Sequence, residues 1–168
     1  MRVLVVGRGS RRRPPGPSQA QFRLVLLELT RSLAADGHAV RVVTRTEAGR
    51  AAIEDAGGEC WIGDPDRIGT LRYALANVTI LLWALGTVDE PDLHGSRLEM
   101  MLEKTIDTMV RGVIYESGPG AAVVERMCTL NEMPFTILEA DPADGAAWAA
   151  AARSAIDALL TAKRPTAG

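Results

Sequence analysis

The chain has 168 residues, of which 47% are hydrophobic. That length and composition suit one globular domain over residues 1–168 and exclude a disordered chain. The 19 Lys and Arg residues against 21 Asp and Glu residues give a net charge of -2. This charge provides no global basic field for nucleic acid or for an anionic membrane, so we expect neither as a partner.

The two cysteines and the apolar stretches indicate in which cellular compartment the protein is expected. Cys60 and Cys128 form no Cys-x-x-Cys pair, which predicts two buried thiols rather than a disulfide framework or a metal site. The apolar residues 3–6 are too few for a signal-peptide core, and residues 78–85 are too few to span a bilayer. We therefore expect a soluble, cytosolic protein.

Short runs of β-type residues recur along the whole chain. They are continuously apolar rather than alternating, which is the pattern of strands that are covered on both faces. The predicted strands span residues 3–6, 40–43, 60–62, 78–85, 113–115 and 135–138.

Segments with helical periodicity lie between these strands. In the first, Ser18 and Gln21 have capping-box spacing and Gly37 marks the end. The fifth segment, from about residue 119, is expected to place Met127 and Leu130 on its buried side. The buried face of the first segment is expected to carry Phe22, Leu26, Leu29 and Leu33.

An aspartate followed by proline predicts the start of two further helices, because the acidic side chain caps free amides and proline suits the first helical position. The third helix is expected to begin at Asp64 and to bury Leu71 and Leu75, and the last helix is expected to begin at Asp141.

Strands and helices thus alternate from end to end, and right-handed crossovers between parallel strands are the usual solution to that pattern. The sequence predicts an α/β fold: a three-layer αβα sandwich with a Rossmann-like parallel sheet in the order 3-2-1-4-5-6. A sixth strand exceeds the five of a flavodoxin-like sheet.

The loop after the first strand begins with Gly7 and Gly9, as a phosphate-binding turn requires. Arg12 stands where the third glycine of G-x-G-x-x-G belongs, within a basic, proline-rich segment at residues 8–17. The incomplete motif indicates either a dinucleotide site or a simple glycine turn.

The order of segments after this loop resembles that of extended and atypical short-chain dehydrogenase/reductase proteins, including the epimerase/dehydratase-like members. The resemblance rests on residues 37–45 (GHAVRVVTR), on residues 63–65 (GDP) and on a fourth strand that ends at Gly86. It covers most of the chain, up to about residue 140.

The resemblance implies a site for an NAD(P) dinucleotide. It places Gly7 and Gly9 at the phosphate turn, Arg45 beside the adenosine ribose, Asp64 near the adenine, and Leu85 and Gly86 along the nucleotide. An arginine in place of the usual acid suits a 2′-phosphate, so NADP(H) is expected rather than NAD(H). A solvated charge at Arg45 and a helix cap at Asp64 are the alternative interpretations.

The chain departs from this family at the catalytic residues. The Tyr-x-x-x-Lys pair is missing, because Pro119 follows Tyr115 and Asn77 follows Tyr73 at that spacing. The family's extended members also carry a substrate lobe after the sixth strand, for which the sequence after Asp141 offers one helix. We therefore expect no hydride transfer by the family's usual mechanism.

Two further segments follow predicted strands. His94 lies in an acidic loop at residues 87–95 and is expected to be solvated, and residues 115–118 (YESG) form either a ligand contact or an ordinary turn. The leading hypothesis is an NAD(P)-binding Rossmann protein of the short-chain dehydrogenase/reductase type, either an atypical oxidoreductase or an NADP(H) sensor. The alternative is a scaffold that has lost the cofactor and acts through protein contacts, as a homodimer.

Overall fold

The structure is a computed structural model that describes residues 1–7 and 17–162. The strands are β1 (Arg2–Gly7), β2 (Ala39–Thr44), β3 (Glu59–Ile62), β4 (Ile80–Ala84), β5 (Gly112–Glu116) and β6 (Phe135–Leu138). The helices are α1 (Pro17–Ala35), α2 (Arg50–Asp55), α3 (Pro91–His94), α4 (Ser96–Ile106), α5 (Ala121–Leu130) and α6 (Gly145–Thr161). Three short 3₁₀ helices are η1 (Glu47–Gly49), η2 (Ile68–Leu71) and η3 (Tyr73–Leu75). In the described part of the chain, no helix has the length and apolar character needed to cross a membrane.

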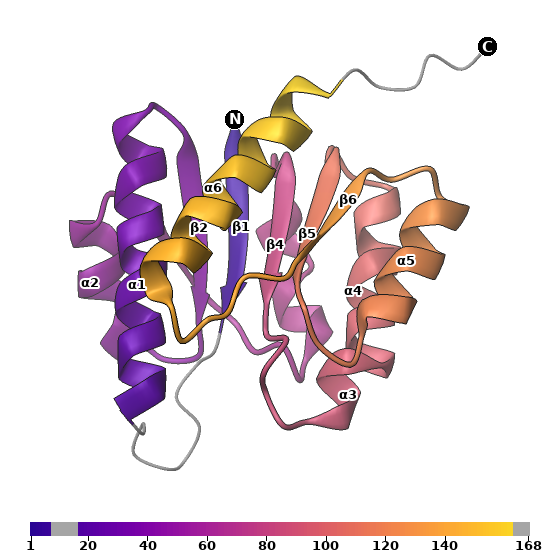
Figure 1. The fold of residues 1–168 in the computed structure, drawn as a ribbon, viewed down its shortest axis with the longest axis horizontal. Coiled ribbons are helices and arrows are strands. Elements are labelled where there is room, and N and C mark those ends of the chain that lie inside the picture. Colours follow the sequence, from indigo (N-terminus) through magenta and orange to yellow (C-terminus); the bar gives the residue numbers. More distant parts are fainter. Residues whose placement is uncertain (8–16, 163–168) are drawn as a thin grey trace.

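The strands form one parallel sheet in the order β3-β2-β1-β4-β5-β6, which confirms the predicted Rossmann-like fold. β1 lies near the middle, where Val5 pairs in register with Val42 of β2 and with Leu82 of β4. The order reverses between β1 and β4, because the chain first builds β2 and β3 on one side and then returns to build β4, β5 and β6 on the other (Figure 1).

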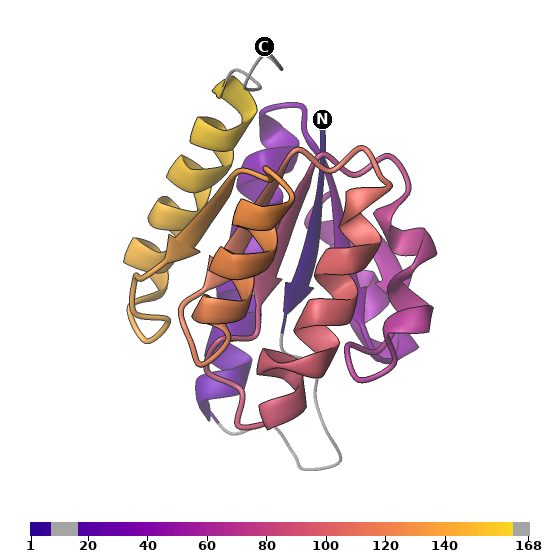
Figure 2. The same ribbon diagram turned by 90° about the vertical axis from the view of Figure 1, so that its right-hand side faces the viewer.

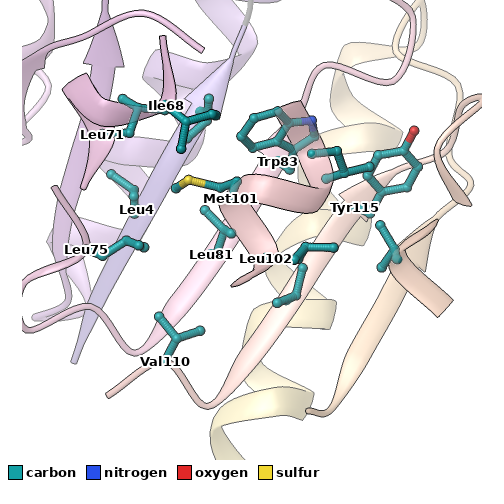
Figure 3. Packing of buried hydrophobic residues seen from close by; sticks show 14 of the residues in the cluster. Leu4, Ile68, Leu71, Leu75, Leu81, Trp83, Met101, Leu102, Val110 and Tyr115 are labelled. Carbon is teal, nitrogen blue, oxygen red and sulfur yellow. The ribbon is translucent and has the colours of Figure 1, made fainter. Parts of the chain in front are cut away.

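Helices cover both faces of the sheet, and successive strand residues point to opposite faces. Val3 and Val5 belong to the core cluster with α1, α2 and α6. Leu4 belongs to the other cluster, in which Figure 3 shows Met101 and Leu102 of α4 over Leu81 and its neighbours. Figure 2 shows α4 and α6 on opposite sides of the sheet. The continuous apolar pattern of the strands follows from this double cover.

The last helix, α6, packs against the first. The rings of Phe22 and Trp148 meet edge to face, with centroids 5.2 Å apart and planes at 72°. Arg153 donates to Ser32 Oγ at 2.9 Å and pairs with Asp36 at the end of α1. The predicted buried face of α1 is confirmed, since its members Phe22, Leu26, Leu29 and Leu33 are all buried.

Both cysteines are free and buried, as predicted. Burial raises the pKa of the Cys128 thiol to about 11, because the apolar surroundings disfavour the charged thiolate. The thiol therefore stays protonated and unreactive at neutral pH.

The two helix starts predicted at Asp-Pro pairs are wrong. The Asp64 carboxylate accepts a hydrogen bond from the amide of Asp66 at 2.9 Å, and the Asp141 carboxylate accepts one from the amide of Ala143 at 2.9 Å. Each aspartate thus closes a local turn, and no helix starts at either one. α6 begins three residues later than predicted, capped by Asp144.

The third predicted α-helix is replaced by η2 and η3. Gly69 lies within η2, and glycine weakens a helix by about 1 kcal/mol relative to alanine. The predicted burial of Leu71 and Leu75 is nevertheless confirmed, at 0% and 1% exposure. The apolar periodicity identified the residues that pack on the sheet, whereas the type of helix depended on local turn chemistry.

α5 buries Val124, Met127 and Cys128, but Leu130 is 76% exposed, contrary to the prediction. Leu130 lies six residues after Val124, which turns it by about 240° from the buried stripe. It is also the last residue of the helix.

A pair of leucines tests this description of the core. Leu98→Ala in α4 should lower the free energy of unfolding by about 2–5 kcal/mol, because Leu98 is completely buried. Leu130→Ala should change it by less than about 0.5 kcal/mol. Chemical denaturation of the two variants measures both values. Equal destabilisation by the two substitutions would contradict the packing described.

Candidate functional site

The carboxyl ends of the strands form one edge of the sheet, at the bottom of Figure 1. In open sheets of this kind, ligands bind in the crevice at that edge where the strand order reverses, here between β1 and β4. Gly7 ends β1 at this point. A Cβ on Gly7 would lie 2.4 Å from Leu26 Cδ1, so a glycine at this position lets α1 approach the end of β1 closely. Gly9 and most of the segment at residues 8–17 lie outside the described residues.

The ends of β2 and β3 bring Arg45 and Asp64 together. Arg45 Nη2 lies 3.4 Å from Asp64 Oδ1 and 3.6 Å from Asp66 Oδ2. The Arg45 side chain is only 20% exposed, so it is not the freely solvated charge of the alternative interpretation. The site has a second aspartate, Asp66, that the sequence analysis did not single out.

The loop that carries these aspartates is held by hydrogen bonds. Thr70 Oγ1 accepts from the Asp64 amide at 2.8 Å and donates to the Arg67 carbonyl at 2.7 Å. The indole of Trp61 donates to the Thr70 carbonyl at 2.9 Å, which ties the loop to β3. The loop thus presents both carboxylates to Arg45 in a defined arrangement.

A small cavity lies beside this cluster, between α1, β2 and α2. Its volume is about 40 Å³, far below the roughly 300–1,000 Å³ of a pocket that encloses a small molecule. It is lined by Gly7, Arg23, Leu26, Leu27, Val42, Val43, Thr44, Gly49, Ala52 and Ile53. The cavity is therefore too small to enclose a ligand of ordinary size.

The loops after β4 and β5 touch each other through two glycines. A Cβ on Gly86 would lie 2.2 Å from the Glu116 carbonyl oxygen, and a Cβ on Gly118 would lie 2.2 Å from the Gly86 carbonyl oxygen. Both contacts involve backbone atoms, so neither residue can be larger without moving the chain. Leu85 is 2% exposed and packs in the core, so its side chain is turned away from a ligand at the edge.

His94 is buried and hydrogen-bonded, contrary to the prediction of a solvated loop residue. It ends α3, is 6% exposed, and has its Nε2 2.6 Å from the Val88 carbonyl oxygen and its Nδ1 3.3 Å from the Tyr115 hydroxyl. A carbonyl only accepts, so Nε2 carries the proton of the neutral ring and Nδ1 accepts from the Tyr115 hydroxyl.

The Tyr115 hydroxyl makes its hydrogen bonds within the protein. It donates to His94 and accepts from the Gly120 amide at 2.8 Å. Tyr115 is completely buried, and burial raises the pKa of its phenol above the ordinary value. The side chain joins β5, α3 and the start of α5, and it is closed to a substrate. Of the predicted segment at residues 115–118, Tyr115 and Glu116 are buried and Ser117 is exposed.

Comparison with known proteins finds likeness in structure alone. No protein-family model matches the chain, and no curated protein matches it. A triphenylmethane reductase of Citrobacter sp. complexed with NADP(H) aligns over 82% of this chain at 20% identity, with a TM-score of 0.55. An NADPH-dependent quinone oxidoreductase of Escherichia coli complexed with NADPH aligns over 82% at 16% identity, with a TM-score of 0.60. A UDP-glucose 4-epimerase of Bifidobacterium longum in complex with NAD+ and UDP aligns over 79% at 14% identity, with a TM-score of 0.51.

The aligned part is about half of each of these proteins, 48% in all three cases. At such low identity the likeness shows the fold alone. The fold is the Rossmann-like one that the resemblance to short-chain dehydrogenase/reductase proteins implies.

Gly86 is predicted to be required for packing. Gly86→Ala should lower the free energy of unfolding by about 2–3 kcal/mol, because its Cβ would overlap backbone atoms of the neighbouring loop. The control is Gly69→Ala, at which a Cβ meets no atom within 4 Å and which should leave stability unchanged or raise it slightly. Thermal and urea unfolding compare the two. A Gly86→Ala protein as stable as the control would show that the loops are farther apart than described.

Tyr115 is predicted to be a structural residue. Tyr115→Phe should cost about 1–3 kcal/mol of unfolding free energy, because it leaves the Gly120 amide and His94 Nδ1 without their partner. The control, Tyr73→Phe, alters a side chain that is 69% exposed and should change stability by less than about 0.5 kcal/mol. Urea denaturation gives both values, and a neutral effect at Tyr115 would rule out the described hydrogen bonds.

Proposed function

We propose that the protein binds a nicotinamide dinucleotide along the carboxyl edge of its sheet and prefers NADP(H) to NAD(H). The observation that carries this proposal is the position of Arg45. It follows β2 directly, next to the reversal of strand order, and its guanidinium is held beside the loop after β3. Rossmann domains bind the adenosine ribose at the end of the second strand, where an arginine accommodates a 2′-phosphate.

The other half of the proposed site is the crevice between β1 and β4. Gly7 and Gly86 lie at its two sides, and both are packed closely against neighbouring chain. The nicotinamide half of the ligand would lie on the β4 and β5 side, since a dinucleotide straddles the reversal point. The three solved proteins described above, with NADP(H), NADPH and NAD+ in their complexes, support a ligand of this class.

The proposed role is that of a binding protein, either a sensor or an oxidoreductase of unusual mechanism. The usual proton donor of the short-chain dehydrogenase/reductase proteins is a tyrosine with a lysine four residues later, which this sequence lacks. Tyr115 does not substitute for it, because its hydroxyl is buried and already bonded to His94 and Gly120.

A second candidate function is a scaffold that acts through protein contacts, as a homodimer. It is favoured by apolar side chains at the ends of α4 and α5. Ile106, Met109 and Leu130 are 46%, 69% and 76% exposed. Ile106 also borders a small pocket with Met127 of α5 and with Met133, so this pocket lies between the two helices.

Titration with NADPH, NADH and ATP distinguishes these functions. The wild type should bind NADPH more tightly than NADH, and Arg45→Gln should weaken NADPH binding by about 10- to 150-fold, the worth of a charge-assisted hydrogen bond. NADH binding should change little. The control is Arg126→Gln, which removes an equal charge from an exposed residue of α5.

Two results would count against the proposal in different ways. If no nucleotide binds at millimolar concentration, the dinucleotide function is wrong and the scaffold function stands. If NADPH binds and Arg45→Gln leaves its preference over NADH unchanged, the ribose has been assigned to the wrong place.

A further inference from the structure

Arg45 meets two carboxylates through a single nitrogen. Its Nη2 lies 3.4 Å from Asp64 and 3.6 Å from Asp66, and all three side chains are between 20% and 34% exposed. Among the described contacts, two carboxylates thus share the one guanidinium of Arg45. A 2′-phosphate that approaches Arg45 must compete with both carboxylates, whereas the neutral 2′-hydroxyl of NAD(H) meets no such competition.

Asp64 has a structural part in the turn that carries both aspartates. Asp64 organises its loop, because its carboxylate accepts the Asp66 amide and its backbone bonds to Thr70. The amide of Asp66, rather than its side chain, makes that turn bond. The carboxylate of Asp66 can thus be neutralised while the turn at Asp64 keeps its own hydrogen bonds.

We propose that Asp66 is a specificity-determining residue that holds the Arg45 guanidinium and limits how strongly the site prefers NADP(H) over NAD(H). The inference rests on the proposed function. Asp66 acts through Arg45: its carboxylate competes with the 2′-phosphate for the same guanidinium, so the preference is set by the Arg45–Asp66 pair rather than by Arg45 alone. Asp64 keeps the guanidinium in place after Asp66 is neutralised.

The test is a double-mutant cycle with Asp66→Asn and Arg45→Gln, measured by titration with NADPH and NADH at fixed ionic strength. Asp66→Asn should tighten NADPH binding by about two- to fivefold, because a partly exposed ion pair no longer competes. It should leave NADH binding essentially unchanged. In the Arg45→Gln background the same substitution should have no effect on NADPH. Asp107→Asn, an exposed aspartate at the end of α4, controls for the loss of one negative charge.

Each other outcome overturns the inference. If the Asp66→Asn protein melts at the same temperature as the control but binds NADPH no more tightly than the wild type, Asp66 does not compete with the 2′-phosphate. If Asp66→Asn tightens NADPH binding equally in the wild type and in the Arg45→Gln protein, Asp66 repels the phosphate directly and not through Arg45. If Asp66→Asn tightens the binding of NADPH and NADH alike, Asp66 does not determine specificity. Failure of every variant and of the wild type to bind either dinucleotide would overturn the proposed function, and this inference with it.

Discussion

The sheet of this protein is covered on both faces, and that constraint determines where any chemistry can take place. Every residue of β4 and β5 is buried, and neighbouring strand residues pack alternately into two separate apolar clusters. Charged or polar groups inside either layer would be costly unless they found partners. Ligand-binding side chains are therefore confined to the ends of the strands and to the loops that follow them.

At the carboxyl edge, the two halves of the sheet differ. The loops after β2 and β3 present a charged cluster of Arg45, Asp64 and Asp66. The loops after β4 and β5 instead pack tightly through Gly86 and Gly118, and the Tyr115 hydroxyl is used internally by His94. Under the proposed function, the first half would recognise a ribose and its substituent. The tyrosine of the other half is buried and closed to a substrate. A binding role follows more naturally from this division than the usual reductase chemistry does.

The sequence predicted the layers of this fold better than the details of its site. Continuous apolar runs identify doubly covered strands because burial on both faces leaves no other pattern, as in residues 80–84. Asp64 accepts the Asp66 amide as a helix cap would, yet the chain beyond it forms a turn, which the Asp-Pro pair does not reveal. The bond between His94 and Tyr115 joins residues 21 apart in sequence and depends on how α3 packs on β5. Asp66 could have been predicted from the sequence, because it stands two residues after Asp64 in the same loop, opposite an arginine that needs a counter-charge.

The most direct test of this account is to map the NADPH contact surface by nitrogen–proton chemical shifts of the labelled protein. The account predicts that the largest shifts fall on two groups of amides, those of residues 44, 45, 63, 64 and 66 and those of residues 86–87 and 117–118. The amides at the helix ends near Ile106 and Leu130 should stay unchanged. Shifts confined to those helix ends, or spread evenly at low amplitude over the surface, would contradict a dinucleotide site at the carboxyl edge of the sheet.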